Sequence, residues 1–221
     1  MPLTPEKVPL FTDLSETELK AIQSCLHEKS FDKGEILFHE GKSCERVFIV
    51  QSGRVKIFRT ASSGREQTLE TLGPGDTCAC NPGSFQWSCA TSAEALTSCT
   101  VWFLSRDDYV RMVQSNSKMS RTLNQLFAER LKNFSCLIEE VSLKDVKKRL
   151  IKFILDLLTD NSQSKGTLYV PFTREEIAQR IGTARETVAR YLYQLKHAGL
   201  IDIKPKQLII KDRAGLEKLL I

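Results

Sequence analysis

The sequence predicts an α+β fold in which an antiparallel β domain precedes a long helix and a C-terminal winged helix-turn-helix. From Phe31 to Leu104, short runs of alternating apolar and polar residues are separated by glycines, as in a small antiparallel barrel or sandwich. From Asn116 to Val141 there is no glycine or proline, and the apolar spacing is helical. From Phe172 to Ile201, two helical patterns flank Gly182. We therefore expect three parts, residues 1–115, 116–143 and 144–221.

The composition favours a protein of the cytoplasm that contacts nucleic acid. The chain has 221 residues, with 32 Lys and Arg against 27 Asp and Glu, a formal net charge of +5. A mild positive excess suits a polyanionic partner without proving one. No apolar run approaches the ~18 residues that span a bilayer, and the N-terminus has no signal-peptide core. Because the cytoplasm keeps thiols reduced, the seven cysteines are not expected to form a disulfide framework.

The β domain is expected to begin with a short amphipathic helix within Leu10–His27. Ser15 is its predicted N-cap, with Glu18 positioned to complete a capping box. Cys25 and His27 would lie on this helix as packing or surface residues, because neither belongs to a metal-binding spacing. The strands expected after it are EILF (35–38), RVFIVQ (46–51), RVKIFR (54–59), EQTLET (66–71) and TVWFL (100–104).

The segment FTREEIAQRIGTARETVARYLYQLKHAGLI (172–201) predicts two helices that pack against each other. Thr183, with Glu186 three residues later, predicts a capping box at the start of the second helix. Arg185, Glu186 and Arg190 would project away from the apolar face of that helix, where such helices meet base edges in a major groove. Arginine can donate to guanine and glutamate can accept from cytosine. A solvated charged face is the alternative. The apolar faces comprise Ile177, Ala178 and Ile181, then Val188, Leu192 and Leu195.

Two short strands and a closing helix are expected after the second helix. Residues 200–203 and 207–210 alternate in polarity around Lys204-Pro205-Lys206, which predicts a β-wing. Lys204 and Lys206 suit contacts to phosphates. The closing helix is expected over Ala214–Leu220.

The string TREEIAQRIGTARETVARYLYQLKHAGLI resembles the DNA-binding helix-turn-helix of the CRP/FNR family of bacterial transcription regulators, and KGEILFHEGKSCERVFIVQSGRVKIFR resembles the cyclic-nucleotide-binding β-roll of that family. The resemblance implies a homodimer that binds palindromic double-stranded DNA and works with RNA polymerase. Arg185, Glu186 and Arg190 would read a TGTGA-like half-site. Arg174 and Thr187 would hold phosphates beside Thr183 at the turn. Residues 1–115 would be the sensor, 116–143 the dimerisation helix and hinge, and 144–221 the DNA-binding domain.

The expected effector pocket departs from the family pattern. Family members that bind a cyclic nucleotide carry a Gly-Glu pair for the ribose and an Arg-Ser or Arg-Thr pair for the phosphate. Alignment on the Gly75-Asp76 turn and on Cys99 places Ala79-Cys80 and Cys89-Ala90 at those positions. Without the arginine, a bound phosphate monoanion would be left unpaired at a cost of several kcal/mol. We therefore do not expect cAMP to be the effector.

The pocket is expected to hold sulfur instead, and three interpretations stay open. Cys78, Cys80 and Cys89 could bind a metal, an iron–sulfur cluster or a haem iron. Cys80 and Cys89 could form a reversible disulfide. The three could also be small packing residues around an uncharged effector. A haem-containing carbon-monoxide sensor belongs to the family, but Ala79 and Asn81 stand where its ligands would be. Cys99 is expected in the core.

The helix expected over Asn116–Val141 has the apolar spacing of a coiled-coil seam, which predicts pairing with a second copy of the chain. A single amphipathic helix packed on its own domain is the alternative. By the resemblance, the same helix would form a wall of the effector pocket. Phe134 and Ser135 stand where family members place polar residues that touch adenine. The predicted seam comprises Met119, Leu123, Phe127, Leu131, Phe134, Ile138 and Val141.

A thiol oxidoreductase is the alternative from another class. The chain has no Cys-x-x-Cys at the start of a predicted helix, and no histidine near Cys78 and Cys80 in sequence to activate a nucleophile. We therefore do not expect an enzyme.

Overall fold

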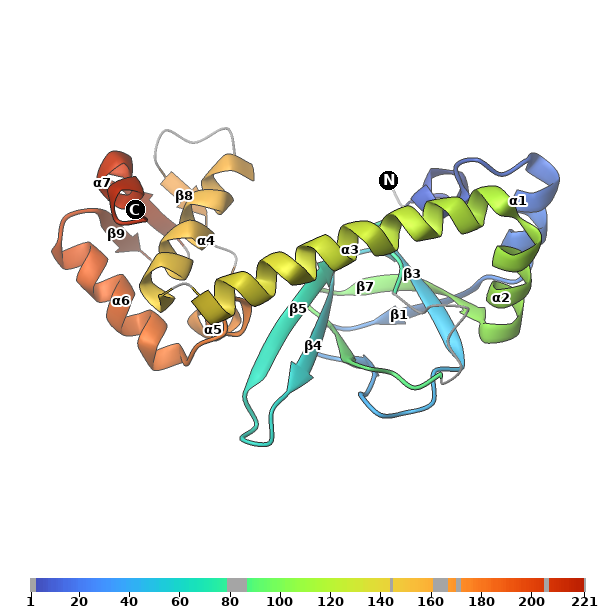
Figure 1. Cartoon of the computed structure of the whole chain (residues 1–221), viewed down its shortest axis with the longest axis horizontal. Helices are drawn as coiled ribbons and strands as arrows, with labels where there is room; N and C mark the ends of the chain where they lie inside the picture. Colours follow the sequence, from blue (N-terminus) through green and yellow to red (C-terminus); the bar gives the residue numbers. More distant parts are fainter. Residues whose placement is uncertain are drawn as a thin grey trace. The chain divides into compact units, whose positions relative to one another are not determined.

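A computed structural model of the chain describes residues 3–78, 87–143, 145–160, 167–169, 172–204 and 207–220. It confirms the α+β class, with antiparallel sheets and helices in two compact units (Figure 1). The first unit is Met1–Arg59 with Thr68–Phe134, and the second is Thr60–Gln67 with Ser135–Ile221. The division between units falls inside the long helix, so the boundaries expected at its two ends stay predictions. No helix in the described ranges is long and apolar enough to cross a bilayer.

The first unit contains two antiparallel sheets around one core. Their strand orders are β1-β7-β3 and β2-β6-β4-β5. In the first sheet, the register pairs Val47 with Leu104 and Ile49 with Trp102, all four of them buried. The strands are β1 (His27–Phe31), β2 (Ile36–Phe38), β3 (Arg46–Ser52), β4 (Val55–Thr60), β5 (Glu66–Leu72), β6 (Ser92–Ala95) and β7 (Cys99–Ser105).

All five predicted strands are confirmed as β2, β3, β4, β5 and β7, and Cys99 is buried in the core as expected. Two strands were not predicted. In β1 only Phe31 is buried, and β6 consists of small or charged residues, Ser-Ala-Glu-Ala. Apart from Phe31, neither carries the β-branched or aromatic side chains that signal a strand in sequence.

The turn between Ser52 and Val55 joins the two sheets and requires glycine. Gly53 has a φ of +81°, which L side chains rarely adopt. A Cβ built there would lie 2.5 Å from the Cβ of Cys99 and 2.5 Å from the carbonyl oxygen of Ser98. The close approach of two chain segments therefore excludes any side chain at this corner.

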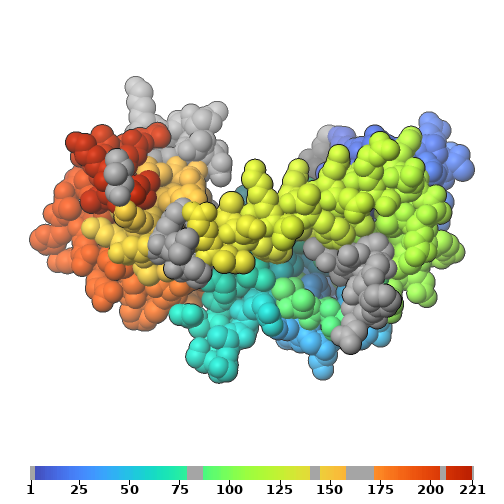
Figure 2. Space-filling model, in the orientation of Figure 1, coloured from blue at the N-terminus to red at the C-terminus, as the bar shows by residue number. Residues whose placement is uncertain are grey.

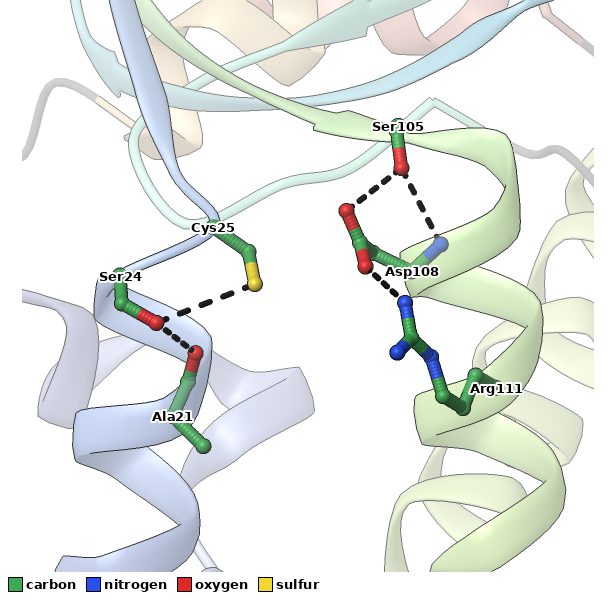
Figure 3. A network of polar contacts seen from close by, with 6 residues as sticks. All are labelled: Ala21, Ser24, Cys25, Ser105, Asp108 and Arg111. Carbon is green, nitrogen blue, oxygen red and sulfur yellow. Dashed lines mark hydrogen bonds and ion pairs between the residues drawn. The ribbon is translucent and has the colours of Figure 1, made fainter.

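The predicted N-terminal helix is α1 (Glu16–Gln23), and its capping box is confirmed. The backbone amide of Ser15 donates to Glu18 at 2.7 Å, and the amide of Glu18 donates to the Ser15 hydroxyl at 3.4 Å. The helix ends earlier than expected, so the placement of Cys25 and His27 on it is wrong. Ser24 Oγ donates to the carbonyl oxygen of Ala21 at 2.7 Å and closes the last turn (Figure 3). His27 begins β1.

A second helix that the sequence analysis missed, α2 (Arg106–Ser115), follows β7 directly. Ser105 is its N-cap, and its hydroxyl accepts from the amide of Asp108 at 3.1 Å and donates to the Asp108 carboxylate at 2.6 Å. Asp108 also pairs with Arg111 on the next turn (Figure 3). These local contacts start a helix immediately at the end of a strand, where no loop composition marks the change.

The long helix is confirmed as α3 (Ser117–Leu143), and its 27 residues span about 40 Å. The predicted seam is wrong in its first part, because Met119 and Leu123 are buried in the core of their own β-roll at 1% and 3% exposure. Leu131 and Ile138, one heptad apart, are 68% and 65% exposed. Side chains of α3 lie open on the surface in the space-filling view (Figure 2).

The second unit packs helices against a small sheet of order β8-β10-β9. The β-wing is confirmed, with Ile203 opposite Leu208 and Ile201 opposite Ile210. The apolar core is built from every helix of the unit after α3, and Leu150, Ile151 and Leu195 are almost fully buried. The elements are α4 (Val146–Asp160), β8 (Thr167–Tyr169), α5 (Arg174–Ile181), α6 (Arg185–His197), β9 (Ile201–Lys204), β10 (Gln207–Ile210) and α7 (Arg213–Lys218).

Candidate nucleic-acid interface and sensor site

The helix-turn-helix begins with a firmly capped α5. Thr173 is its N-cap, and a capping box that the sequence analysis missed ties Thr173 to Glu176 at 2.6 and 3.1 Å. At the other end Gly182 adopts the left-handed conformation, with φ of 68°. The amides of Gly182 and Thr183 both donate to the carbonyl oxygen of Ala178. The turn between the two helices is therefore set by main-chain bonds that only glycine permits easily.

The predicted capping box at the start of α6 is wrong. The N-cap is Ala184, which has no capping side chain, and α6 begins at Arg185. Thr183 is excluded from the role because its amide is still bonded to α5, which places it in the turn. The Glu186 carboxylate, which the box would have held, lies exposed in the first turn of α6. It is therefore accessible to a ligand.

The outward face of α6 carries the residues predicted to read bases. Arg185, Glu186 and Arg190 are all exposed. The ion pairs found among the described residues include none of the three. The opposite face is buried through Val188, Leu192 and Leu195. The sequence pattern thus predicted correctly which side of the helix is free.

Other predicted contact residues surround this face. Arg174 is exposed at the first position of α5, whereas Thr183 and Thr187 are half-buried. Lys204 is exposed at the end of β9, and Lys206 lies outside the described residues. The sequence analysis missed Tyr193, which is 62% exposed on α6 with its ring 5.2 Å from that of His197. Tyr193 does not belong to the buried Val188/Leu192/Leu195 face, and this position was the sequence signal that it would be exposed.

An ion pair fixes the wing to α6. Lys196 Nζ lies 2.8 Å from the Asp202 carboxylate of β9. This bond to Lys196, with a second from the amide of Ile203, holds the pKa of Asp202 below its usual value. The pair is exposed, so its energy is small. Its main effect is to orient the wing relative to the last turn of α6.

In the first unit, Cys78 is a buried residue that bonds to the main chain of β3. Its side chain is 5% exposed, and its Sγ accepts from the amide of Phe48 at 3.2 Å. The amide of Cys78 donates to the carbonyl oxygen of Phe48 at 3.0 Å, which fixes the segment against β3. Cys80 lies outside the described residues. The predicted set of Cys78, Cys80 and Cys89 is therefore not tested as a whole.

Cys89 lies beside a second cysteine, Cys44, which is buried. The amide of Cys44 donates to the carbonyl oxygen of Trp87 at 2.7 Å, and the amide of Cys89 donates to that of Lys42 at 2.8 Å. This antiparallel pairing brings the two cysteines diagonally across from each other. Burial, with the adjacent Cys44 thiol, raises the pKa of Cys89 to about 12. No group of three or more His, Cys, Asp or Glu side chains suited to a metal occurs in the described part of the chain.

The sensor unit also holds an arginine that the sequence analysis missed. Arg130 on α3 lies with its Nε 3.0 Å from the Glu70 carboxylate of β5, and it donates to the carbonyl oxygen of Thr77. Its Nη1 is buried without a hydrogen-bond partner in the described ranges. Arg130 comes seven residues, or two helical turns, after the buried Leu123, so it lies on the inward face of α3. A charged residue on this apolar face was the sequence signal that could have identified it. Of the predicted pocket residues on α3, Phe134 is half-buried and Ser135 is exposed.

Known proteins and protein families are similar to this chain along nearly its whole length. Residues 28–116 match the cyclic nucleotide-binding domain family, and residues 148–219 match the Crp-like helix-turn-helix domain family. The chain is 30% identical over 216 residues to a CRP-like cAMP-activated global transcriptional regulator of Mycobacterium tuberculosis, covering 95% of both chains. It is 28% identical over 211 residues to a cyclic AMP receptor protein of Thermus thermophilus, covering 96% of both. A solved structure of a putative transcriptional regulator of the crp/fnr family from Eubacterium rectale is similar with a TM-score of 0.76 and 27% identity, over 96% of this chain and 97% of that one.

The raised pKa of Cys89 predicts slow alkylation. Because the thiolate is the nucleophile, a pKa of about 12 leaves roughly one Cys89 in 10⁴ ionised at pH 8. We expect iodoacetamide at that pH to label the exposed Cys136 first and Cys89 at least tenfold more slowly, as followed by peptide mass spectrometry. Protein denatured in urea, where both thiols are solvated, is the control and should lose the difference. Equal rates in the folded protein would show that Cys89 is not shielded as described.

Proposed function

Because the chain belongs to the CRP/FNR family of transcriptional regulators, we propose that it binds palindromic DNA as a homodimer and reads each half-site with α6. Regulators of this family bind DNA and act as dimers. The observation that carries the proposal for this chain is the outward face of α6. It offers two arginines and a glutamate at an exposed N-terminal half, on a helix whose other face is held in the core. Two such helices on one two-fold axis suit half-sites about one helical turn apart.

The side chains of α6 suit a half-site resembling TGTGA. Arg185 and Arg190 can donate to the two acceptors of guanine, and Glu186 can accept from the amino group of cytosine on the complementary strand. The 13 residues of α6 form a helix about 20 Å long, which is enough to lie in a major groove. The proposed phosphate contacts are Arg174 on α5, Thr183 in the turn, Thr187 on α6, and Lys204 and Lys206 at the wing. RNA polymerase is the proposed protein partner.

Base contacts and phosphate contacts are distinguishable by mutation. Arg185→Ala should cost roughly 1–3 kcal/mol of DNA-binding free energy and relax the preference at one base position, because it removes a base contact. Lys204→Ala should weaken all sequences alike and lower the slope of log K against log salt by about 0.9. Fluorescence anisotropy with a series of duplexes and salt concentrations measures both effects.

Arg111→Ala is the matched control for loss of a positive charge. Arg111 is an exposed residue of α2 in the sensor unit, with its side chain 72% exposed, and its loss should leave both the affinity and the base preference unchanged. Normal operator binding by Arg185→Ala would refute the assignment of base contacts to α6.

The dimer is proposed to form along the exposed side of α3. Leu131 and Ile138 recur at a seven-residue interval and are about two-thirds exposed in the single chain. Phe127 packs against the edge of the β-roll core and Phe134 is half-buried, so both would flank the seam. Large apolar side chains in a row on a helix are the usual signature of a partner helix. The side chain of Val141, predicted to extend the seam, lies outside the described residues.

Disrupting the seam should separate the dimer. A double variant, Leu131→Glu with Ile138→Glu, places like charges at the contact and should be monomeric at micromolar concentration in light-scattering measurements. It should also lose most operator affinity, because the two half-sites would be bound independently. Cys136→Glu, on the same helix but turned about 140° away from Leu131, is the control and should stay dimeric. A double variant that stays fully dimeric would place the interface elsewhere.

We further propose that the sensor responds to something other than cAMP, although the relatives from Mycobacterium tuberculosis and Thermus thermophilus carry that ligand in their names. The cation that the described part of the pocket offers, Arg130, is already paired with Glu70. Phe134 supplies a bulky apolar side chain where a polar one would be needed. A nucleotide phosphate would therefore enter a site with no net positive charge to neutralise it.

The same proposal includes effectors that act on the cysteines of the pocket. A soft metal, an iron–sulfur cluster or a haem could be bound with Cys80, or Cys80 and Cys89 could be oxidised to a disulfide. The raised pKa of Cys89 works against its acting as a nucleophile, whereas a metal could displace its proton. Absorption spectroscopy and elemental analysis of protein purified without oxygen distinguish a coloured cofactor from thiol chemistry.

Titration with cAMP tests the sensor proposal directly. We expect no saturable heat in isothermal calorimetry at micromolar cAMP, and no change in operator affinity on adding it, because the phosphate would be left unpaired. Micromolar binding with a matching rise in DNA affinity would contradict the proposal and place the chain with the cAMP-activated regulators.

A further inference from the structure

The DNA-binding unit contains a small cavity, distinct from the face of α6, that surrounds a buried arginine. Its volume is about 90 Å³. Three cationic side chains and one carboxylate line it, together with apolar side chains that include Phe153 and Leu137. The charged residues are Arg149, Lys152 and Asp156 of α4 and Arg180 of α5. The walls therefore carry a net charge of +2, from three cations and one carboxylate.

Arg149 is a buried, positively charged residue in the wall of this cavity. It is 8% exposed, and both its Nε and its Nη1 are buried without a hydrogen-bond partner in the described ranges. Burial lowers the pKa of its guanidinium, against a smaller opposing effect of Asp145. Arginine nevertheless stays charged in proteins. A buried cation with orphaned donors costs several kcal/mol, and an anion bound beside it would offset part of that cost.

The surrounding groups are arranged to share an anion with Arg149. Arg180 is held in place by stacking on the ring of Phe172, with its Cζ 4.3 Å from the ring centroid. Phe172 in turn packs against Phe153, at 5.9 Å between centroids. An aromatic wall thus positions one of the cations that line the cavity. Lys152 lies almost one helical turn beyond Arg149, on the neighbouring row of α4.

We propose that this cavity binds a small oxyanion of the phosphate class. A volume of about 90 Å³ is several times what one water molecule needs, which leaves room for a tetrahedral oxyanion. It is far below the ~300 Å³ at which organic ligand pockets begin, which excludes a nucleotide. The guanidinium of Arg149, which lines the cavity, supplies N–H donors, and Arg180 and Lys152 add positive charge. The anion would link α4 to α5, the first helix of the helix-turn-helix.

This inference concerns binding and stability, and only its effect on DNA affinity rests on the proposed function. An anion held between α4 and α5 stabilises the unit that presents α6, so cellular oxyanion levels would set how firmly the reading helix is held. Because binding is measured without DNA, failure of the operator assay and failure of this inference are separate results.

Inorganic phosphate and sulfate, with chloride at matched ionic strength, test the proposal on the full chain. We expect calorimetry to show a saturable rise in the unfolding temperature with phosphate and sulfate that chloride does not give. Arg149→Met should abolish the rise. In oxyanion-free buffer the same variant should be at least as stable as the wild type, because it removes an uncompensated buried charge.

Two further variants separate the pocket from general charge effects. Lys152→Met removes a lining cation while keeping Arg149, and should weaken phosphate binding about tenfold in isothermal titration. Lys147→Met, on the same helix but outside the cavity, should bind phosphate like the wild type. The proposal is overturned if the wild type shows no saturable response, if Arg149→Met keeps it, or if Arg149→Met is markedly less stable in oxyanion-free buffer, which would make Arg149 a purely structural residue.

Discussion

Burial of one face of α3 in the β-roll core is the interaction on which the rest of the molecule depends. Met119 and Leu123 are almost fully buried there, and burial of side chains of this size contributes roughly 1.5–3 kcal/mol each. Once that face is fixed, the helical repeat sets the direction of the residues that follow it on α3 within the same unit. Arg130 is thereby turned inward to Glu70, while Leu131 is turned out to the surface. One packing contact therefore determines both which charge faces the β-roll and where the exposed apolar stripe begins.

The two buried arginines show how differently a charge can be accommodated. Arg130 has an ion pair with a carboxylate and donates to a carbonyl oxygen, although its Nη1 has no hydrogen-bond partner in the described ranges. Arg149 lies beside other cations, and its Nε and Nη1 have no partner among the described residues. Desolvation disfavours both charges, and of the two arginines only Arg130 has an ion pair within the described residues to offset it. A cation with such an ion pair attracts a phosphate less than a cation without one.

Much of the fold could be predicted from the sequence, because strands such as RVFIVQ and the long amphipathic helix carry strong periodic signals. The sides of α5 and α6 that face the core followed from the same periodicity. What escaped prediction depends on tertiary contacts. β1 is a strand because β7 pairs with it, not because of its own polar residues. Ala184 rather than Thr183 caps α6, because the αL turn at Gly182 delays the helix by one residue. The proximity of Cys44 and Cys89 arises from main-chain pairing between segments 45 residues apart in sequence.

Helix α6 is held within its unit at its start, along its inner face and at its last turn. Its start is defined by the left-handed Gly182 turn, its inner face by Val188, Leu192 and Leu195, and its last turn by the ion pair from Lys196 to Asp202. A packed core is bistable rather than continuously deformable, so a signal has little means of reshaping α6 itself. Asp145 already belongs to the start of α4, because its carboxylate accepts from the amide of Lys147 at 2.7 Å and its carbonyl oxygen accepts from the amide of Arg149 at 3.0 Å. The contacts within the unit therefore fix the shape of α6, and under the proposed function a signal would act on how the whole unit meets DNA.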